Sequence, residues 1–171
     1  MTNLSPADLR ERVAALMPQV TADLTELVRI PSVNFPGYDP DPVVACAQRC
    51  AELLREAGAT DVELIPGATG VPTVRAEVPG PPGSPVVLLY SHYDVQPGGD
   101  PGKWNSPAFE PTLRDDRMYG RGAADDKSGV VTHVACVRAF EGRPPVTLRI
   151  LLEGEEEHGG GGADVSADQR G

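Results

Sequence analysis

Three clusters of acidic and histidine residues could take part in catalysis, and the first follows an apolar run directly. Residues 91–97 read Ser-His-Tyr-Asp-Val-Gln-Pro, immediately after the run Pro-Val-Val-Leu-Leu-Tyr. His92 and Asp94 are two positions apart, so in an extended chain both side chains lie on one face. A carboxylate placed there can hold one imidazole nitrogen while the other nitrogen binds a metal ion. Taken alone, the pair is more commonly a hydrogen-bonded histidine at the end of a strand.

The other two clusters are acidic. Residues 119–127 read Tyr-Gly-Arg-Gly-Ala-Ala-Asp-Asp-Lys, and the adjacent Asp125 and Asp126 could simply cap a helix. The glycines in front of them indicate a more tightly folded backbone than a cap needs. Residues 153–157, Glu-Gly-Glu-Glu-Glu, follow another apolar run. Their four carboxylates repel one another unless a cation compensates, although a solvated charged stretch is the usual alternative.

The three clusters together predict a metal centre better than any one of them does. His92, Asp125 and Glu157 offer nitrogen and oxygen ligands that suit zinc or a related divalent ion. They are 33 and 32 positions apart, so only folding can bring them together. A second glutamate beside a ligand glutamate is what metal-assisted hydrolysis needs, because a base must take the proton of the attacking water.

Other catalytic motifs fail in their spacing. The segment from Gly98 to Lys103 is one residue too short for a phosphate-binding loop, and Trp104 stands where Ser or Thr is needed. Residues 120–125 lack the third glycine of a dinucleotide fingerprint, and the chain has no Gly-x-Ser-x-Gly motif. The three cysteines are interpreted as small buried apolar residues, and His133 as a surface or packing residue of a helix. His158 adjoins the acidic cluster, and its role is left open.

Hydrophobic spacing predicts a layered α/β domain around these clusters. We expect helices over residues 6–28, 43–57 and 128–140, with Pro18 kinking or splitting the first. Strands are expected over 61–65, 73–78, 86–90 and 146–152, and a hairpin turns at Asp115-Asp116. The continuous apolar run 85–90 is typical of a strand covered on both faces. A sheet that ends with the strand 146–152 would instead keep a free edge and an uncovered face. Residues 159–162 are glycines, and residues 163–171 show no apolar period.

Composition narrows the function classes. The chain has 171 residues, about one domain, and a formal net charge of −10. This acidic balance, without a basic stripe, argues against nucleic acid and membrane surfaces as partners. We find no signal peptide and no apolar run long enough to span a membrane, and three cysteines make no disulfide framework. A cytoplasmic protein is therefore expected.

The motifs resemble those of the M20 metallopeptidases, the aminoacylase, carboxypeptidase and dipeptidase relatives with a two-metal site. The resemblance rests on residues 91–97, 120–127 and 153–157 and extends over residues 5–159. Residues 104–111, Trp-Asn-Ser-Pro-Ala-Phe-Glu-Pro, are similar to the dipeptidase branch with its carnosinase-like enzymes, and residues 27–33 to the family's early segment. The resemblance implies a three-layer α/β/α zinc-peptidase-like catalytic domain.

Residue roles follow from the resemblance alone. It implies that His92, Asp125 and Glu157 bind metal, that Asp125 bridges two divalent ions, and that the Asp125–Asp126 peptide bond is cis. The ions would be Zn²⁺, with Mn²⁺ or Co²⁺ as alternatives. Asp94 would orient His92, and Glu156 would be the general base that activates water for attack on a peptide or amide carbonyl. The substrate would be a small peptide, in particular a dipeptide, or an N-acyl amino acid.

Family members are longer than this chain. They carry a lid domain, further ligands and, in the whole protein, a homodimer surface that cannot be placed here. We therefore expect residues 1–171 to be the N-terminal part of the catalytic domain, truncated near the glycine run. Two alternatives to a dipeptidase remain: an N-acyl amino acid or succinyl-diaminopimelate-type amidohydrolase, and an inactive fragment with a partial metal site.

Overall fold

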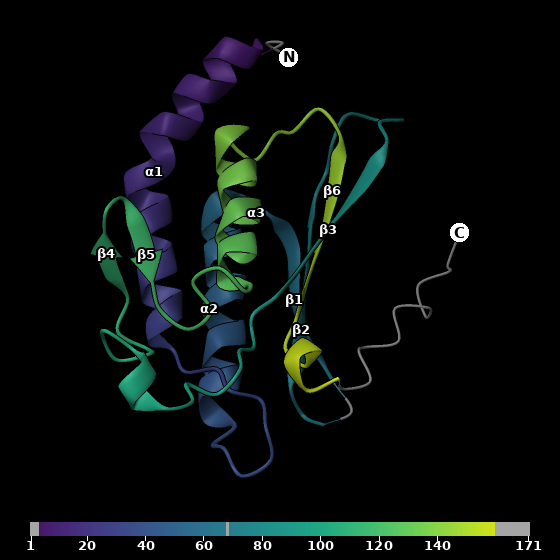
Figure 1. Cartoon of the computed structure of the whole chain (residues 1–171). Coiled ribbons are helices and arrows are strands. Elements are labelled where there is room, and N and C mark those ends of the chain that lie inside the picture. Colours follow the sequence, from purple (N-terminus) through teal and green to yellow (C-terminus); the bar gives the residue numbers. More distant parts are fainter. Residues whose placement is uncertain (1–3, 68, 160–171) are drawn as a thin grey trace.

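The computed structural model describes residues 4–67 and 69–159, and in that part of the chain helices and strands form an α/β fold (Figure 1). The helices are α1 (Pro6–Arg29), α2 (Asp41–Ala57) and α3 (Lys127–Ala139). The main sheet contains β1 (Thr60–Pro66), β2 (Pro72–Val78), β3 (Val86–His92) and β6 (Thr147–Glu153), and a hairpin contains β4 (Thr112–Arg114) and β5 (Arg117–Tyr119). Short 3₁₀ turns occur at Pro101–Lys103 and Glu156–His158. The predicted α/β class is confirmed, whereas the expected aperiodic tail lies outside the described residues.

Local signals in the sequence set the ends of the helices. Ser5 and Asp8 form a reciprocal capping box at the start of α1, with Pro6 in the first helical position. Pro18 does not split this helix, because α1 continues through it. α2 ends at Gly58, whose φ of 103° lies in the left-handed region that glycine tolerates. None of the described helices is long and apolar enough to cross a membrane.

The sheet has the strand order β1-β2-β6-β3, with β3 parallel to β6 and the other pairs antiparallel. The three helices lie on one face of this sheet (Figure 1), so the described residues form two of the layers of an α/β/α arrangement. The core between them is made of apolar side chains from α2, α3 and the strands, among them Leu53, Leu54, Val74, Val134 and Ile150.

Strand β3 is not covered on both faces, which corrects the expectation from its apolar sequence. Val86, Leu88 and Tyr90 are 55%, 64% and 47% exposed. They alternate along an edge strand, so they share the face opposite to the helices among the described residues. Among residues 4–67 and 69–159, the sheet ends with β3 instead of β6, and the outer face of β3 is uncovered.

The parallel pairing of β3 with β6 determines where the first and third sequence clusters lie. His92 at the end of β3 is in register with Glu153 at the end of β6. The first and third sequence clusters therefore leave the sheet side by side, at the carboxyl ends of two neighbouring strands. This is where ligands bind in open α/β sheets.

Candidate metal centre

His92, Asp125 and Glu157 come together at this edge of the sheet. One potential ligand atom from each lies within 4.8 Å of the other two. His92 Nε2 is 3.1 Å from Asp125 Oδ1 and 3.8 Å from Glu156 Oε2. His92 is the last residue of β3, Asp125 lies in the turn before α3, and Glu157 lies in the 3₁₀ turn after β6. Folding thus collects one nitrogen and two carboxylates from segments distant in the sequence.

The side chain of Asp94 contacts both His92 and Glu157. It is fully buried. Its Oδ1 lies 3.3 Å from His92 Nδ1, and its Oδ2 accepts a hydrogen bond from the backbone N–H of Glu157 at 3.0 Å. The backbone oxygen of Asp94 also lies 3.1 Å from His92 Nδ1. These contacts on Nδ1 leave Nε2 facing Asp125 and Glu156.

The surroundings of His92 favour positive charge. Burial alone would lower its pKa, but the hydrogen bond and negative charge of Asp94, together with the bond to Asp125, raise the pKa of His92 to about 9. The same carboxylates would attract a divalent cation. An imidazole with two or three carboxylates is a donor set that suits zinc and related ions, with ligand distances of about 2.0–2.2 Å. The residues present therefore fit such an ion. The side chain of Asp125 is 80% exposed, so the site is open to solvent on that side.

The four glutamates do not share one site, contrary to the expectation of mutual repulsion. Glu153 accepts a hydrogen bond from the Tyr90 hydroxyl at 2.7 Å. Glu155 is buried and accepts one from the hydroxyl of Thr69. Only Glu156 and Glu157 approach the histidine, so the fold distributes the carboxylates among different surroundings.

The turn before α3 contains one predicted feature and one that the sequence did not reveal. The predicted feature is the cis peptide bond between Asp125 and Asp126, as the family resemblance implied. The other is a buried lysine. Lys127 is fully buried, and its Nζ donates to the backbone oxygens of Leu27 and Ile30 at 2.8 and 2.7 Å. This ammonium fastens the turn that carries Asp125 to the end of α1. A lysine after two aspartates gives no signal of burial in the sequence.

Gln96 was also missed as a site residue. Its Nε2 donates to Glu157 Oε2 at 2.7 Å and approaches the backbone oxygen of Glu157 at 3.3 Å. Its spacing from Asp94 could have identified it. In an extended segment, residues two positions apart, such as Asp94 and Gln96, lie on the same face.

The remaining histidines and cysteines lie outside the cluster. His133 packs α3 against β3, since its Nε2 is 2.9 Å from Ser91 Oγ and 3.0 Å from the backbone oxygen of Tyr90. His158 makes an edge contact with the ring of Phe35. Cys46 and Cys50 are buried as predicted, whereas Cys136 is only partly buried, and all three thiols are free.

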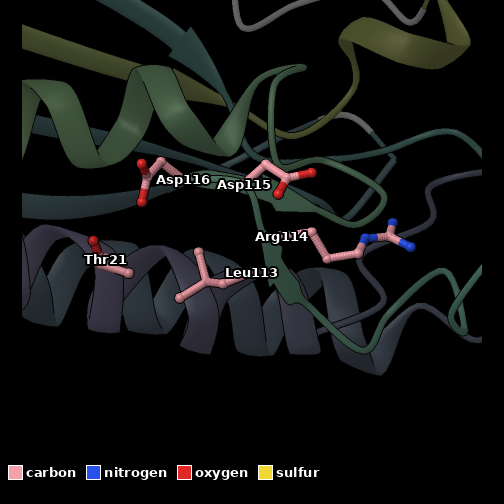
Figure 2. A pocket seen from close by; sticks show the side chains of 5 residues that line it. All are labelled: Thr21, Leu113, Arg114, Asp115 and Asp116. Atoms are coloured by element: carbon pink, nitrogen blue, oxygen red, sulfur yellow. The ribbon is translucent and has the colours of Figure 1, made fainter.

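A separate hollow lies between α1 and the β4–β5 hairpin (Figure 2). Its lining residues are Thr21, Leu113, Arg114, Asp115 and Asp116. In Figure 2 the side chain of Arg114 points away from the two aspartates, which themselves point in different directions. No predicted site residue lines this hollow and its polar groups do not converge, so it offers no second candidate centre.

Comparisons with known proteins agree with this geometry. Residues 88–170 match the model of peptidase family M20/M25/M40. The cysteinylglycine-S-conjugate dipeptidase of Corynebacterium striatum is 35% identical over 162 residues, which cover 93% of this chain and 34% of that protein. The Cys-Gly metallodipeptidase DUG1 of Saccharomyces cerevisiae is 27% identical over 87% of this chain and 34% of its own length. The crystal structure of human carnosine dipeptidase 1 superposes with a TM-score of 0.80 at 28% identity, over 96% of this chain and 37% of that one. The chain thus spans about a third of the length of these relatives.

Proposed function

We propose that the chain belongs to peptidase family M20/M25/M40 and that it forms the metal-binding part of a metal-dependent dipeptidase. The observation that carries the proposal is the convergence of His92, Asp125 and Glu157 within 4.8 Å. The sequence around the three residues resembles the family's motifs, and two dipeptidases about three times as long contain the same fold.

In this proposal His92, Asp125 and Glu157 would hold divalent ions, and Asp125 would serve as a ligand shared by both ions. We propose Zn²⁺, with Mn²⁺ and Co²⁺ as alternatives, because imidazole and carboxylate ligands serve all three. When bound, such ions polarise a carbonyl and lower the pKa of water. Asp94 holds the imidazole of His92 from the side of Nδ1, which keeps Nε2 directed at the cluster.

Glu156 would be the general base. Its Oε2 lies 3.8 Å from His92 Nε2, and its side chain is 48% exposed, so water and substrate can reach it. Its carboxylate would take a proton from the attacking water as the new C–O bond forms at the peptide carbonyl. It would then give this proton to the leaving amine as the C–N bond breaks.

A dipeptide is the substrate class that we favour. Relatives named for Cys-Gly and carnosine hydrolysis support it. An N-acyl amino acid is the second candidate, because the succinyl-diaminopimelate desuccinylase of a Bradyrhizobium strain is 34% identical over 77% of this chain.

The place of the chain in a whole protein is part of the proposal. Its span of about a third of its relatives supports an N-terminal part of the catalytic domain within residues 1–171. For the whole protein we propose a homodimer. The free thiols support a cytoplasmic location.

The test is metal binding followed by turnover. Equilibrium dialysis of the purified chain against Zn²⁺, Mn²⁺ and Co²⁺ should give saturable binding that His92→Ala and Glu157→Gln each weaken at least tenfold. Glu156→Gln should keep binding, because the general base is not a ligand in this proposal. Hydrolysis of Cys-Gly, carnosine and N-succinyl amino acids is then measured with the metal-loaded chain. Binding without turnover would restrict the chain to a metal site, and absence of binding would contradict the proposal.

A further inference from the structure

We propose that Gln96 is a positioning residue that fixes the carboxylate of Glu157 and thereby sets the metal affinity of the site. The inference rests on the proposed function, and it concerns a contact that the proposed roles of His92, Asp94, Asp125 and Glu157 do not use.

The contact has the geometry of a directed hydrogen bond. The side-chain amide of Gln96 donates to Glu157 Oε2 at 2.7 Å, which is short for an N–H···O bond and typical of an ionised acceptor. The same Nε2 lies 3.3 Å from the backbone oxygen of Glu157. The backbone N–H of Glu157 is held by Asp94 Oδ2. Among the described residues, the side chain and both backbone polar groups of Glu157 are therefore held from the segment that follows β3.

As a consequence of this contact, the two carboxylate oxygens of Glu157 are not equivalent. Gln96 occupies Oε2, and among the described residues no other hydrogen bond reaches the carboxylate of Glu157. The other oxygen is left for a cation. A carboxylate held in this way loses less rotational freedom on binding, because its orientation is already fixed. Partners that orient a metal ligand typically account for 10- to 100-fold in metal affinity.

A neighbouring amide provides a matched control. Asn34 donates from its Nδ2 to the backbone oxygen of Gly154 at 2.8 Å, so it also ties the loop after β6 to the rest of the domain. In the part of the chain that the structure describes, it makes no hydrogen bond to a proposed ligand. If Gln96 only tethered the loop, Gln96→Leu and Asn34→Leu would act alike.

The experiment measures Zn²⁺ affinity of the full chain by competition with a chelator dye, for the wild type, Gln96→Leu, Asn34→Leu, Glu157→Gln and the double variant Gln96→Leu/Glu157→Gln. We expect Gln96→Leu to lose about 10- to 100-fold in affinity and Asn34→Leu less than threefold. In the Glu157→Gln background the Gln96→Leu substitution should cost much less than it does in the wild type. Circular dichroism spectra and thermal melting curves of the metal-free variants test whether each variant is folded.

The outcomes separate the two proposals. Equal affinity of Gln96→Leu and wild type, an equal loss for Asn34→Leu, or an undiminished loss in the Glu157→Gln background would each overturn the role of Gln96 and leave the metal site standing. Failure of the wild-type chain to bind any of Zn²⁺, Mn²⁺ and Co²⁺ would overturn the proposed function, and the role of Gln96 with it. If Gln96→Leu does not fold, Gln96→Asn, whose shorter side chain keeps the polarity, takes its place with the same expected loss.

Discussion

Asp94 Oδ2 accepts a hydrogen bond from the backbone N–H of Glu157 at 3.0 Å, although the two residues are 63 positions apart. The same carboxylate lies 3.3 Å from His92 Nδ1 through its other oxygen. One buried side chain thus aligns the end of β3 with the turn after β6. The geometry of the candidate centre depends on this carboxylate, because one oxygen accepts from the Glu157 backbone and the other lies beside the His92 imidazole.

Asp94→Asn tests that dependence with almost no change in shape. An amide has one acceptor oxygen, so its NH₂ group must face either the imidazole or the Glu157 N–H. We expect Zn²⁺ affinity to fall about 10- to 100-fold and the free energy of unfolding to fall by about 1–3 kcal/mol. Chelator competition and urea unfolding measure the two effects. Asp116→Asn, on the exposed hairpin turn, serves as the control, and unchanged affinity in Asp94→Asn would refute the role of Asp94.

Gly129→Ala should destabilise the chain, although alanine normally favours a helix by about 1 kcal/mol over glycine. A Cβ at Gly129 in α3 would lie less than 3.0 Å from the Asp126 carboxylate and from Ser91 Oγ. Asp126 Oδ2 also lies 3.3 Å from the backbone nitrogen of His92, so displacing it disturbs the end of β3. We expect a loss of about 1–3 kcal/mol in unfolding free energy.

The control for Gly129→Ala lies in the same helix. Thr132 is exposed on α3, and its substitution by alanine should change the unfolding free energy by less than about 0.5 kcal/mol. A Gly129→Ala variant that is as stable as the wild type or more stable would show that the turn before α3 can rearrange without cost.

The sequence predicts the helices and strands well for identifiable reasons. Apolar residues at helical spacing and the glycine after Ala57 mark the helices, and three ordered motifs mark His92, Asp125 and Glu157. What escapes prediction depends on tertiary contacts. A continuous apolar run such as that of β3 does not tell which face is covered. In the same way, the burial of Lys127 and the separation of Glu153 from Glu157 depend on partners contributed by distant segments.

The ion pair between Arg138 and Asp23 should contribute strongly to the packing of α3 on α1. Arg138 Nη1 donates to Asp23 Oδ2, and the two side chains are only 9% and 10% exposed. Removing one partner of a buried pair leaves an uncompensated charge, which costs about 3–5 kcal/mol. We expect this loss for Asp23→Ala and for Arg138→Ala, and a smaller than additive loss for the double variant, measured by urea unfolding. The pair Arg75–Glu63, at 42% and 54% exposure, is the control, and Glu63→Ala should cost at most about 1 kcal/mol.

The lowered pKa of Cys46 should contribute a rise of stability with pH, whereas the raised pKa values of His92 and Cys50 contribute a fall. A hydrogen bond from the Cys50 thiol lowers the pKa of the buried Cys46, with the nearby Lys127 ammonium acting in the same direction and burial opposing it. In the unfolded chain a cysteine titrates at about 8.5. Between its lowered pKa and that value, Cys46 binds more protons in the unfolded chain than in the folded one. This group alone therefore adds at most about 1.4 kcal/mol per pH unit to the free energy of unfolding.

Urea unfolding at pH 6, 7, 8 and 9 in the presence of a reductant measures this slope. Cys46→Ala should make the slope less positive than in the wild type, because the variant lacks the thiol that loses its proton more readily in the folded chain. Cys136→Ala should not, since burial raises the pKa of Cys136 and its protonated form is the one favoured by folding. Equal slopes in the wild type and Cys46→Ala would mean that the thiol of Cys46 stays protonated in the folded chain, and that the Lys127 ammonium is balanced by its backbone acceptors rather than by a thiolate.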